Sequence, residues 1–563
     1  MEIPPPSRRA LLLRALVWCL AALPALAAAL WASYAARWPE LPGDRLALRE
    51  GAASWRWDEL LRDDGGARHL LAKALHRAAL EVPGASIASV TWVTVLLAVS
   101  TALALGSLLR RSHALTGLAG PASLAAAGLL VASPAFGLVW LHGERLGLLL
   151  APLLLLLALG WLQGTSRPAL RQVGALALVA IAPFCHTHGL LVGVALLPAI
   201  VAAAHTAGSR RIGGWVGAAL VLSLAAGWYS VQPLAAQGLS AGGGIFAVLP
   251  FAAFVRDLCM HAGSAWLDLL PSTELDELTL GALSWLAPLV LLFVGDRSVA
   301  ARARTAPWWS CVLFGLGLVL WNVLRYDAEP PVGRWREALF GVFLLPVGLL
   351  GVVAGRFGGS ALRIAFGALL VLAAQDWWLG LEDVRIARSL TQQQEARQQL
   401  PAAWTKTLPQ VRAGLAAADE SELRERGRVP EQTPRLDEAL ATAFTTAWTE
   451  GAPSPAPVAI GRTLRGELRG SLRTPPPVLV LLVVLVGSDA PRVVAATAPD
   501  FRAHGRAVPW EILLPEAELE RLSGPAGGDV VALGVLTAPL QFVPLSGGFV
   551  VRDGVLASAN TKR

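Results

Sequence analysis

Residues 88–109 read ASVTWVTVLLAVSTALALGSLL, a run of 22 residues without a charged side chain. A helix needs about 20 mostly apolar residues to cross the hydrocarbon core of a bilayer, so this run predicts a membrane-spanning helix. Working outward from it, the same criterion predicts about eleven spans. They lie near residues 10–33, 88–109, 117–138, 145–163, 171–187, 188–205, 212–232, 278–295, 307–324, 337–355 and 361–380.

The composition also predicts a membrane protein. Apolar residues make up 55% of the 563 residues and charged residues only 15%, whereas soluble domains carry about 25% charged residues. The formal charge of +7 is attributed to arginines in short cytoplasmic loops rather than to nucleic-acid binding. The four cysteines are far apart and show no disulfide or metal-type spacing.

The placement of charge predicts the topology. With Arg8 and Arg9 in the cytoplasm, every expected inside loop is short and basic, and the acidic segments 34–87 and 233–277 fall outside. The first apolar run is longer than the core of a signal peptide, so it is expected to stay as the first span. An odd number of spans places residues 381–563 outside a cytoplasmic (inner) membrane.

The tail differs from the membrane domain (1–380). Residues 381–450 have the composition of helices, and the proline-bearing stretch 451–477 predicts a linker. The run VLVLLVVLV at 478–486 is too short to cross a bilayer as a helix and suits a buried strand. With further strands expected at 529–537 and 547–554, residues 478–563 predict a small extracytoplasmic α/β domain. Participation of 478–486 in a twelfth membrane segment is the alternative.

The first outside loop (34–87) carries the densest set of reactive side chains. Asp58 and Glu59 precede a helical stretch on which His69, Lys73, His76 and Arg77 fall near one face. A basic strip beside carboxylates at a membrane surface suits an anionic, phospholipid-like substrate. The alternative is an ordinary amphipathic interfacial helix with solvated charges.

Further polar residues are expected at the same ends of other helices, where they could converge on the first loop. Each set could equally be a membrane anchor or a structural ion pair. A zinc site on His186 and His188 would need ligands that the sequence does not identify. The candidate binding residues outside the first loop are His142, Arg145, His188, Arg334 and Arg336.

Three stretches of the sequence resemble membrane glycosyltransferases of the GT-C superfamily, in particular the protein O-mannosyltransferase-like and TMTC-like members. They are Trp57-Asp58-Glu59 before the second helix, SPAFGLVWLHGERLG with Arg145, and Gly333-Arg334-Trp335-Arg336. The resemblance covers residues 1–380. The acidic pair is Asp-Glu rather than Asp-Asp, Gly147 stands where an acid is usual, and the region of His186-Thr187-His188 replaces a Lys-Glu pair.

The resemblance implies transfer of a sugar from a polyprenyl-phosphate-linked donor to an acceptor on the extracytoplasmic face. Asp58 or Glu59 would act as the general base, or would hold a divalent cation such as Mg²⁺ or Mn²⁺. Arg145, Arg334 or Arg336 would bind the donor phosphate, with His69, Arg77, His142 and His188 as further substrate-binding residues. The partners would be membrane lipids, the donor and the acceptor.

Two other functions are compatible with the sequence. A transporter or flippase of a lipid-linked anionic substrate would carry ionisable groups at mid-membrane depth or interrupted helices in repeated halves. A membrane scaffold with a decayed acidic site would account for the departures from the family pattern.

Overall fold

The computed structural model describes residues 22–28, 69–80, 87–115, 119–133, 146–164, 167–208, 211–240, 251–267, 274–325 and 340–374, nine strands between 458 and 558, and a few single positions. The chain divides into two compact units. The first comprises Met1–Ala36 and Ala47–Val384, and the second Arg37–Leu46 and Arg385–Arg563.

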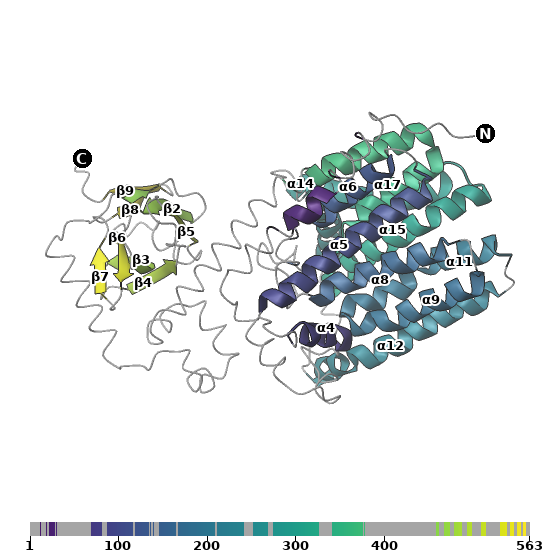
Figure 1. Ribbon diagram of the computed structural model, residues 1–563, viewed down its shortest axis with the longest axis horizontal. Helices are drawn as coiled ribbons and strands as arrows, with labels where there is room; N and C mark the ends of the chain where they lie inside the picture. Colours follow the sequence, from purple (N-terminus) through teal and green to yellow (C-terminus); the bar gives the residue numbers. More distant parts are fainter. Residues whose placement is uncertain are drawn as a thin grey trace. The chain divides into compact units, whose positions relative to one another are not determined.

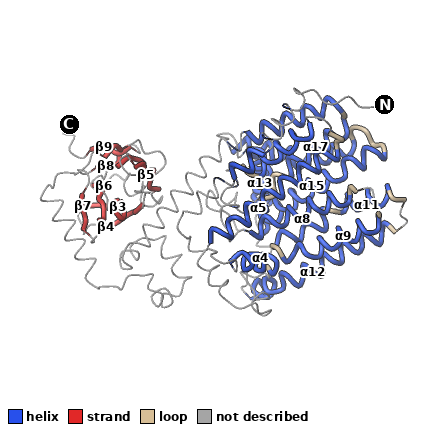
Figure 2. The backbone as a smooth tube through the Cα atoms, in the orientation of Figure 1, coloured by secondary structure: helices blue, strands red, loops and turns tan. Residues whose placement is uncertain are grey.

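The described part of the first unit is a bundle of α-helices with two short 3-10 turns (Figures 1 and 2). The elements are α4 (Leu70–Leu80), α5 (Ile87–Ser112), α6 (Ala119–Val131), α8 (Leu146–Leu162), α9 (Pro168–Ile181), η3 (Ala182–Phe184), η4 (Thr187–Gly189), α10 (Leu190–Ala195), α11 (Leu197–Thr206), α12 (Ile212–Ser240), α13 (Phe251–Leu267), α14 (Glu274–Phe293), α15 (Val299–Arg325) and α17 (Leu344–Phe357). A further apolar helix spans Gly359–Ala374.

By length and composition, four of the described helices can cross a membrane: Val90–Ser112, Thr187–Thr206, Ile212–Tyr229 and Val299–Leu324. Six shorter apolar helices accompany them, and each predicted span from residue 88 onward coincides with one of these ten segments. Of the predicted span 10–33, residues 22–28 are helical, and most of the rest lies outside the described residues. Large apolar side chains such as Leu224 and Ile364 are more than 70% exposed on the outside of the bundle, as expected where lipid rather than water covers the surface.

Glycines of α17 let this helix pack closely against α15. A Cβ atom on Gly348 would lie 2.8 Å from the carbonyl oxygen of Trp308, and one on Gly351 would overlap the indole ring. A Cβ on Gly355 would lie 2.6 Å from Thr305. Small residues at turn spacing let two backbones approach closely, which is how helices associate where no hydrophobic effect acts between them.

Residues 168–206 form a helical hairpin. Gln172 Nε2 donates to the carbonyl of Ile200 at 3.4 Å, so residues equally far from His186 lie side by side. Gly189 closes the turn, where a Cβ would lie 2.8 Å from the backbone nitrogen of Pro183. The two predicted segments 171–187 and 188–205 are therefore separate helices, with the turn at the predicted polar break.

The structure corrects the expected loop 233–277. Helix α12 continues to Ser240, and α13 (Phe251–Leu267) lies within the segment. Helix α13 packs on α14, where Trp285 Nε1 donates to the carbonyl of Leu258 at 3.3 Å and Gly281 lies against the backbone of Cys259. The charged residues of this segment predicted a loop. Helix α13 nevertheless packs on α14 through two tryptophans and a glycine of this helix pair.

The connectors after α5, α8, α14 and α17 gather at one end of the bundle, here called the basic end. Arg111 Nη1 donates to the carbonyl of Gly160 at 3.2 Å. The ring of His113 stacks on Trp308 of α15, with centroids 5.6 Å apart. Arg356, in the last turn of α17, donates to the connector before α15. The arginine-bearing loops predicted to lie inside thus share one end; the side of the membrane on which it lies stays a prediction.

The described residues of the second unit are all in antiparallel strands. A three-stranded sheet has the order β1-β2-β5, and a second sheet has the order β4-β3-β6-β8-β9 with β7 beside β6. The strands are β1 (Val458–Ile460), β2 (Glu467–Leu472), β3 (Val478–Val486), β4 (Arg492–Thr497), β5 (Val508–Leu513), β6 (Val530–Thr537), β7 (Gln541–Pro544), β8 (Phe549–Arg552) and β9 (Val555–Ser558).

The apolar run 478–486 is strand β3, paired with β4 on one side and β6 on the other. The predicted strands at 529–537 and 547–554 are confirmed as β6 and β8. Strands β1 and β2 lie inside 451–477, which the sequence predicts as a linker. The helices expected at 381–450, and any helical part of the α/β domain, fall outside the described residues.

Replacing Gly351 by Leu is expected to lower the free energy of unfolding by about 1–3 kcal/mol, because the new side chain must displace Trp308. The measurement is thermal unfolding in detergent. The matched control is Gly367→Leu, at a helical glycine whose Cβ would meet nothing within 4 Å. Equal melting temperatures for both variants would contradict the packing described.

Acid should destabilise the bundle through His113. Burial, aided by the charge of Arg304, lowers the pKa of His113 from 6.5 to about 4. The unfolded chain therefore binds a proton that the folded chain excludes, and stability falls as the pH drops from about 6.5 to about 4, by at most about 3 kcal/mol. His113→Phe should flatten this slope in thermal unfolding at stepped pH. A slope that persists unchanged would assign it to other groups.

Candidate functional site

Helix α4 turns its basic face toward the protein. The sequence LLAKALHRAAL consists almost entirely of good helix formers. Leu71 and Leu75 pack against the core, and Arg77 is only 7% exposed. The predicted helix after the acidic pair is confirmed, and its basic strip is not the solvated face of an ordinary interfacial helix.

The hairpin turn fixes two histidines. His186 has an extended backbone (φ −165°, ψ 159°) and caps η4, because its Nδ1 accepts a hydrogen bond from the backbone N–H of His188 at 3.2 Å. A neutral imidazole that accepts at Nδ1 carries its proton on Nε2, so Nε2 is a donor. The His188 side chain is 3% exposed.

The structure brings His69, at the start of α4, against this turn. Its ring stacks on His186 with centroids 5.1 Å apart and an interplanar angle of 19°. The rings of His186 and His188 meet edge to face, with centroids 4.3 Å apart. These three residues are called the histidine cluster below. Two candidates from distant parts of the sequence, His69 and His188, thus both contact His186.

Helix α8 packs closely against the histidine cluster at Gly147. A Cβ on Gly147 would lie 2.6 Å from the carbonyl oxygen of Cys185 and 3.6 Å from the Cβ of His186. The other end of α8 meets Arg111 at the basic end. The histidine cluster therefore lies at the end of the bundle opposite the basic end.

The described ionisable side chains of α4 are positive or neutral. Burial lowers the pKa of His76 below its ordinary value, so this α4 side chain is neutral at pH 7. The buried guanidinium of Arg77 is a fixed positive charge on the same helix. The described part of α4 therefore carries positive charge.

The cluster is not arranged as a metal centre. Parallel rings about 5 Å apart do not aim their nitrogens at one point, and among the described residues no group of three or more His, Cys, Asp and Glu side chains could hold a metal ion. The predicted cation ligands Asp58 and Glu59 lie outside the described residues, as do His142, Arg145, Arg334 and Arg336.

Sequence reasoning missed two polar groups near this end of α15. Asn322 is 2% exposed, and neither its Nδ2 nor the buried Nε1 of Trp321 has a hydrogen-bond partner within the described structure. Both residues lie about 20 Å beyond Trp308 along α15, on the side away from the basic end. An asparagine in an otherwise apolar span is the signal that could have found them.

Comparisons with models of protein families, with curated proteins and with solved structures give no match for this chain. Its function is therefore inferred from its residues and their geometry.

Replacing Gly189 by Ala should open the histidine turn, because the added methyl group cannot fit beside Ala182 and Pro183. We expect a melting temperature lower by several degrees, from a loss of about 1–3 kcal/mol, and faster maleimide labelling of the buried Cys185 when the other cysteines are replaced by serine. Gly213→Ala, where a Cβ meets nothing within 4 Å, is the control. Unchanged labelling in Gly189→Ala would refute the tight turn.

Proposed function

We propose that the chain is an integral membrane glycosyltransferase that transfers a sugar from a polyprenyl-phosphate-linked donor to an acceptor on the extracytoplasmic face. The observation that carries the proposal is that His69 and His188 both contact His186 at the end opposite the basic end, with the buried Arg77 two turns further along α4. A site of this kind, at the end of apolar helices, suits a ligand with a phosphate and a long apolar tail.

In this proposal, the histidine cluster and Arg77 bind the donor phosphate. Imidazole N–H groups and a guanidinium donate strong hydrogen bonds to phosphate oxygens. The same donors would stabilise the charge that builds on the phosphate as it leaves the sugar, which is where catalysis gains most from fixed donors. Asp58 or Glu59 would remove the proton from the acceptor hydroxyl or hold a divalent cation, and Arg145, Arg334 and Arg336 would add further positive charge.

The topology belongs to the same proposal. We infer that all eleven predicted segments cross the membrane, with the N-terminus inside and the strand-bearing second unit outside. A helix such as Leu146–Leu162, with 17 residues, is about 25 Å long and close to the ~30 Å core. The basic end would then face the cytoplasm and the histidine cluster the opposite side.

Transport of a lipid-linked anionic substrate is the second candidate. The interrupted segment 182–197 and the buried Asn322 favour it, because transporters bind substrates where helices are broken and polar groups enter the membrane. The break, however, coincides with a hairpin turn rather than with mid-membrane depth, and this placement favours a site at the membrane boundary.

The test is sugar transfer in membranes from labelled polyprenyl-phosphate sugars. Because each variant removes a donor to the phosphate, His69→Ala and His188→Ala should each lower kcat/KM about 10- to 100-fold, and Asp58→Asn/Glu59→Gln should abolish transfer. His205→Ala is the matched control, at the exposed far end of the same hairpin. Transfer that survives in both histidine variants would remove the cluster from the site. Donor movement across vesicles without transfer would favour the transporter.

A further inference from the structure

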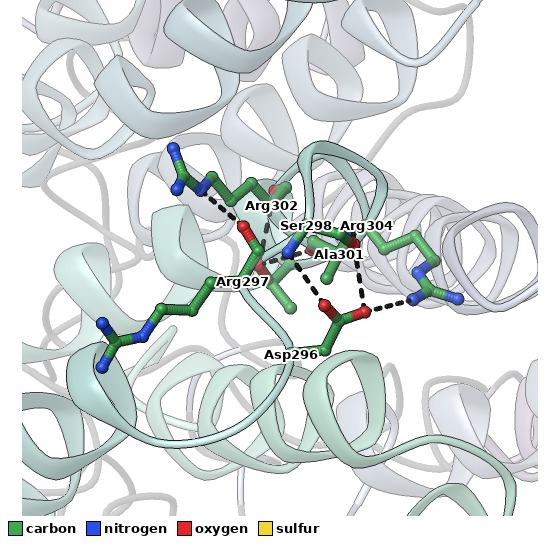
Figure 3. A network of polar contacts seen from close by, with 7 residues as sticks. Asp296, Arg297, Ser298, Ala301, Arg302 and Arg304 are labelled. Atoms are coloured by element: carbon green, nitrogen blue, oxygen red, sulfur yellow. Dashed lines mark hydrogen bonds and ion pairs between the residues drawn. The ribbon is translucent and has the colours of Figure 1, made fainter.

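A second concentration of charge lies at the basic end, in the connector between α14 and α15. Asp296 orders this turn: its two carboxylate oxygens accept from the backbone N–H of Ser298 at 2.8 Å and from the Ser298 hydroxyl at 3.0 Å (Figure 3). The Ser298 hydroxyl in turn accepts from the N–H of Ala301 at 3.1 Å and caps α15. Gly295, with φ +86°, gives the turn a conformation that other residues rarely adopt.

Arginines from three places on the chain surround this turn. Arg297 donates to the carbonyl of Phe293, and Arg302 Nε donates to the carbonyl of Arg297 at 3.0 Å. Arg356 of α17 donates through Nη1 to the carbonyl of Val294 at 3.1 Å. Arg297, Arg302 and Arg356 are called the arginine turn below.

The charge of the arginine turn is not balanced by the acids of the described structure. The nearby carboxylate, Asp296, pairs with Arg304 at 3.8 Å on the side away from Arg297 and Arg302 (Figure 3) and also attracts Arg356, so one acid faces four arginines. Arg297 and Arg302 are exposed, while the Nε–H of Arg356 is buried without a hydrogen-bond partner in the described residues. A guanidinium has five N–H donors, so the three side chains retain donors for an anion.

The surroundings of the arginine turn indicate the kind of anion. Exposed apolar side chains border it on each helix: Phe293 is 71% exposed, Val299 70% and Phe357 47%. A free phosphate ion gains nothing from contact with apolar side chains, so it does not account for this border. An anionic phospholipid uses both parts, since its phosphate pairs with arginine and its acyl chains cover the apolar side chains.

We propose that Arg297, Arg302 and Arg356 bind the phosphate of an anionic glycerophospholipid whose acyl chains lie along Phe293, Val299 and Phe357. The site is independent of the histidine cluster and of the proposed transferase activity, because it lies at the other end of the bundle. It would hold the turn between α14 and α15 at the membrane boundary.

The experiment is native mass spectrometry of the full chain in neutral detergent, titrated with dioleoylphosphatidylglycerol or dioleoylphosphatidylcholine. Wild type should retain one phosphatidylglycerol in preference to phosphatidylcholine. Arg297→Gln/Arg302→Gln should weaken retention of this lipid at least about tenfold, from the loss of two charge-assisted contacts. Arg302→Glu alone, which leaves the contact between Arg297 and Phe293 in place, should weaken it similarly.

The control Arg110→Gln/Arg211→Gln removes the same charge from exposed arginines elsewhere and should change retention less than about twofold. A loss equal to that of the arginine-turn variant would overturn the site in favour of diffuse attraction. Inorganic phosphate is the remaining probe. Displacement of the lipid by inorganic phosphate at millimolar concentration would overturn the phospholipid assignment and identify a site for free phosphate.

Discussion

The packing around Trp308 connects the main parts of the helical unit. Its indole is fully buried, with the glycine face of α17 against it and the ring of His113 stacked on it. Three elements from distant parts of the sequence are therefore fixed at one level of the bundle. Because α15 is a single helix through this contact, its position also sets the arginine turn at one end and Asn322 at the other. In a lipid environment, where apolar side chains gain little by leaving the solvent, such close backbone approach is the available source of stability.

The two ends of the bundle differ in how their polar groups are solvated. At the basic end most arginine side chains are exposed to solvent or donate to backbone carbonyls at helix ends. These arginines are therefore solvated without further side-chain partners. At the histidine end the polar groups are buried or half-buried and face other helices. Burying polar groups costs free energy unless a partner compensates it, so an evenly solvated anchor does not account for this end.

Elements that depend on local composition could be predicted from the sequence. Elements and contacts that depend on long-range packing could not. Apolar runs predicted the helices from residue 88 onward, and the polar break at Cys185–Gly189 predicted the hairpin turn. Helix α13 was missed because the acids of this segment, Asp257, Asp268, Glu274, Asp276 and Glu277, predicted an outside loop, although tryptophans join α13 to α14. Strands β1 and β2 were missed because the surrounding prolines dominate 451–477. Spacing identified the basic strip of α4 but could not tell which way it faces, and the contact between His69 and His186 is a long-range one that no local pattern contains.

Under the proposed GT-C assignment, two departures from the family pattern lie in contact with each other. Gly147 occupies a place where an acid is usual, and the turn at His186-Thr187-His188 replaces a Lys-Glu pair; a Cβ on Gly147 would touch both Cys185 and His186. An acidic side chain at position 147 would not fit beside this turn, so the two changes form one local rearrangement. In the proposed transferase, this local rearrangement would leave a site built around imidazole donors. A rebuilt site of that kind can hold a phosphate directly through imidazole and guanidinium N–H groups, with any divalent cation left to the acidic pair Asp58 and Glu59.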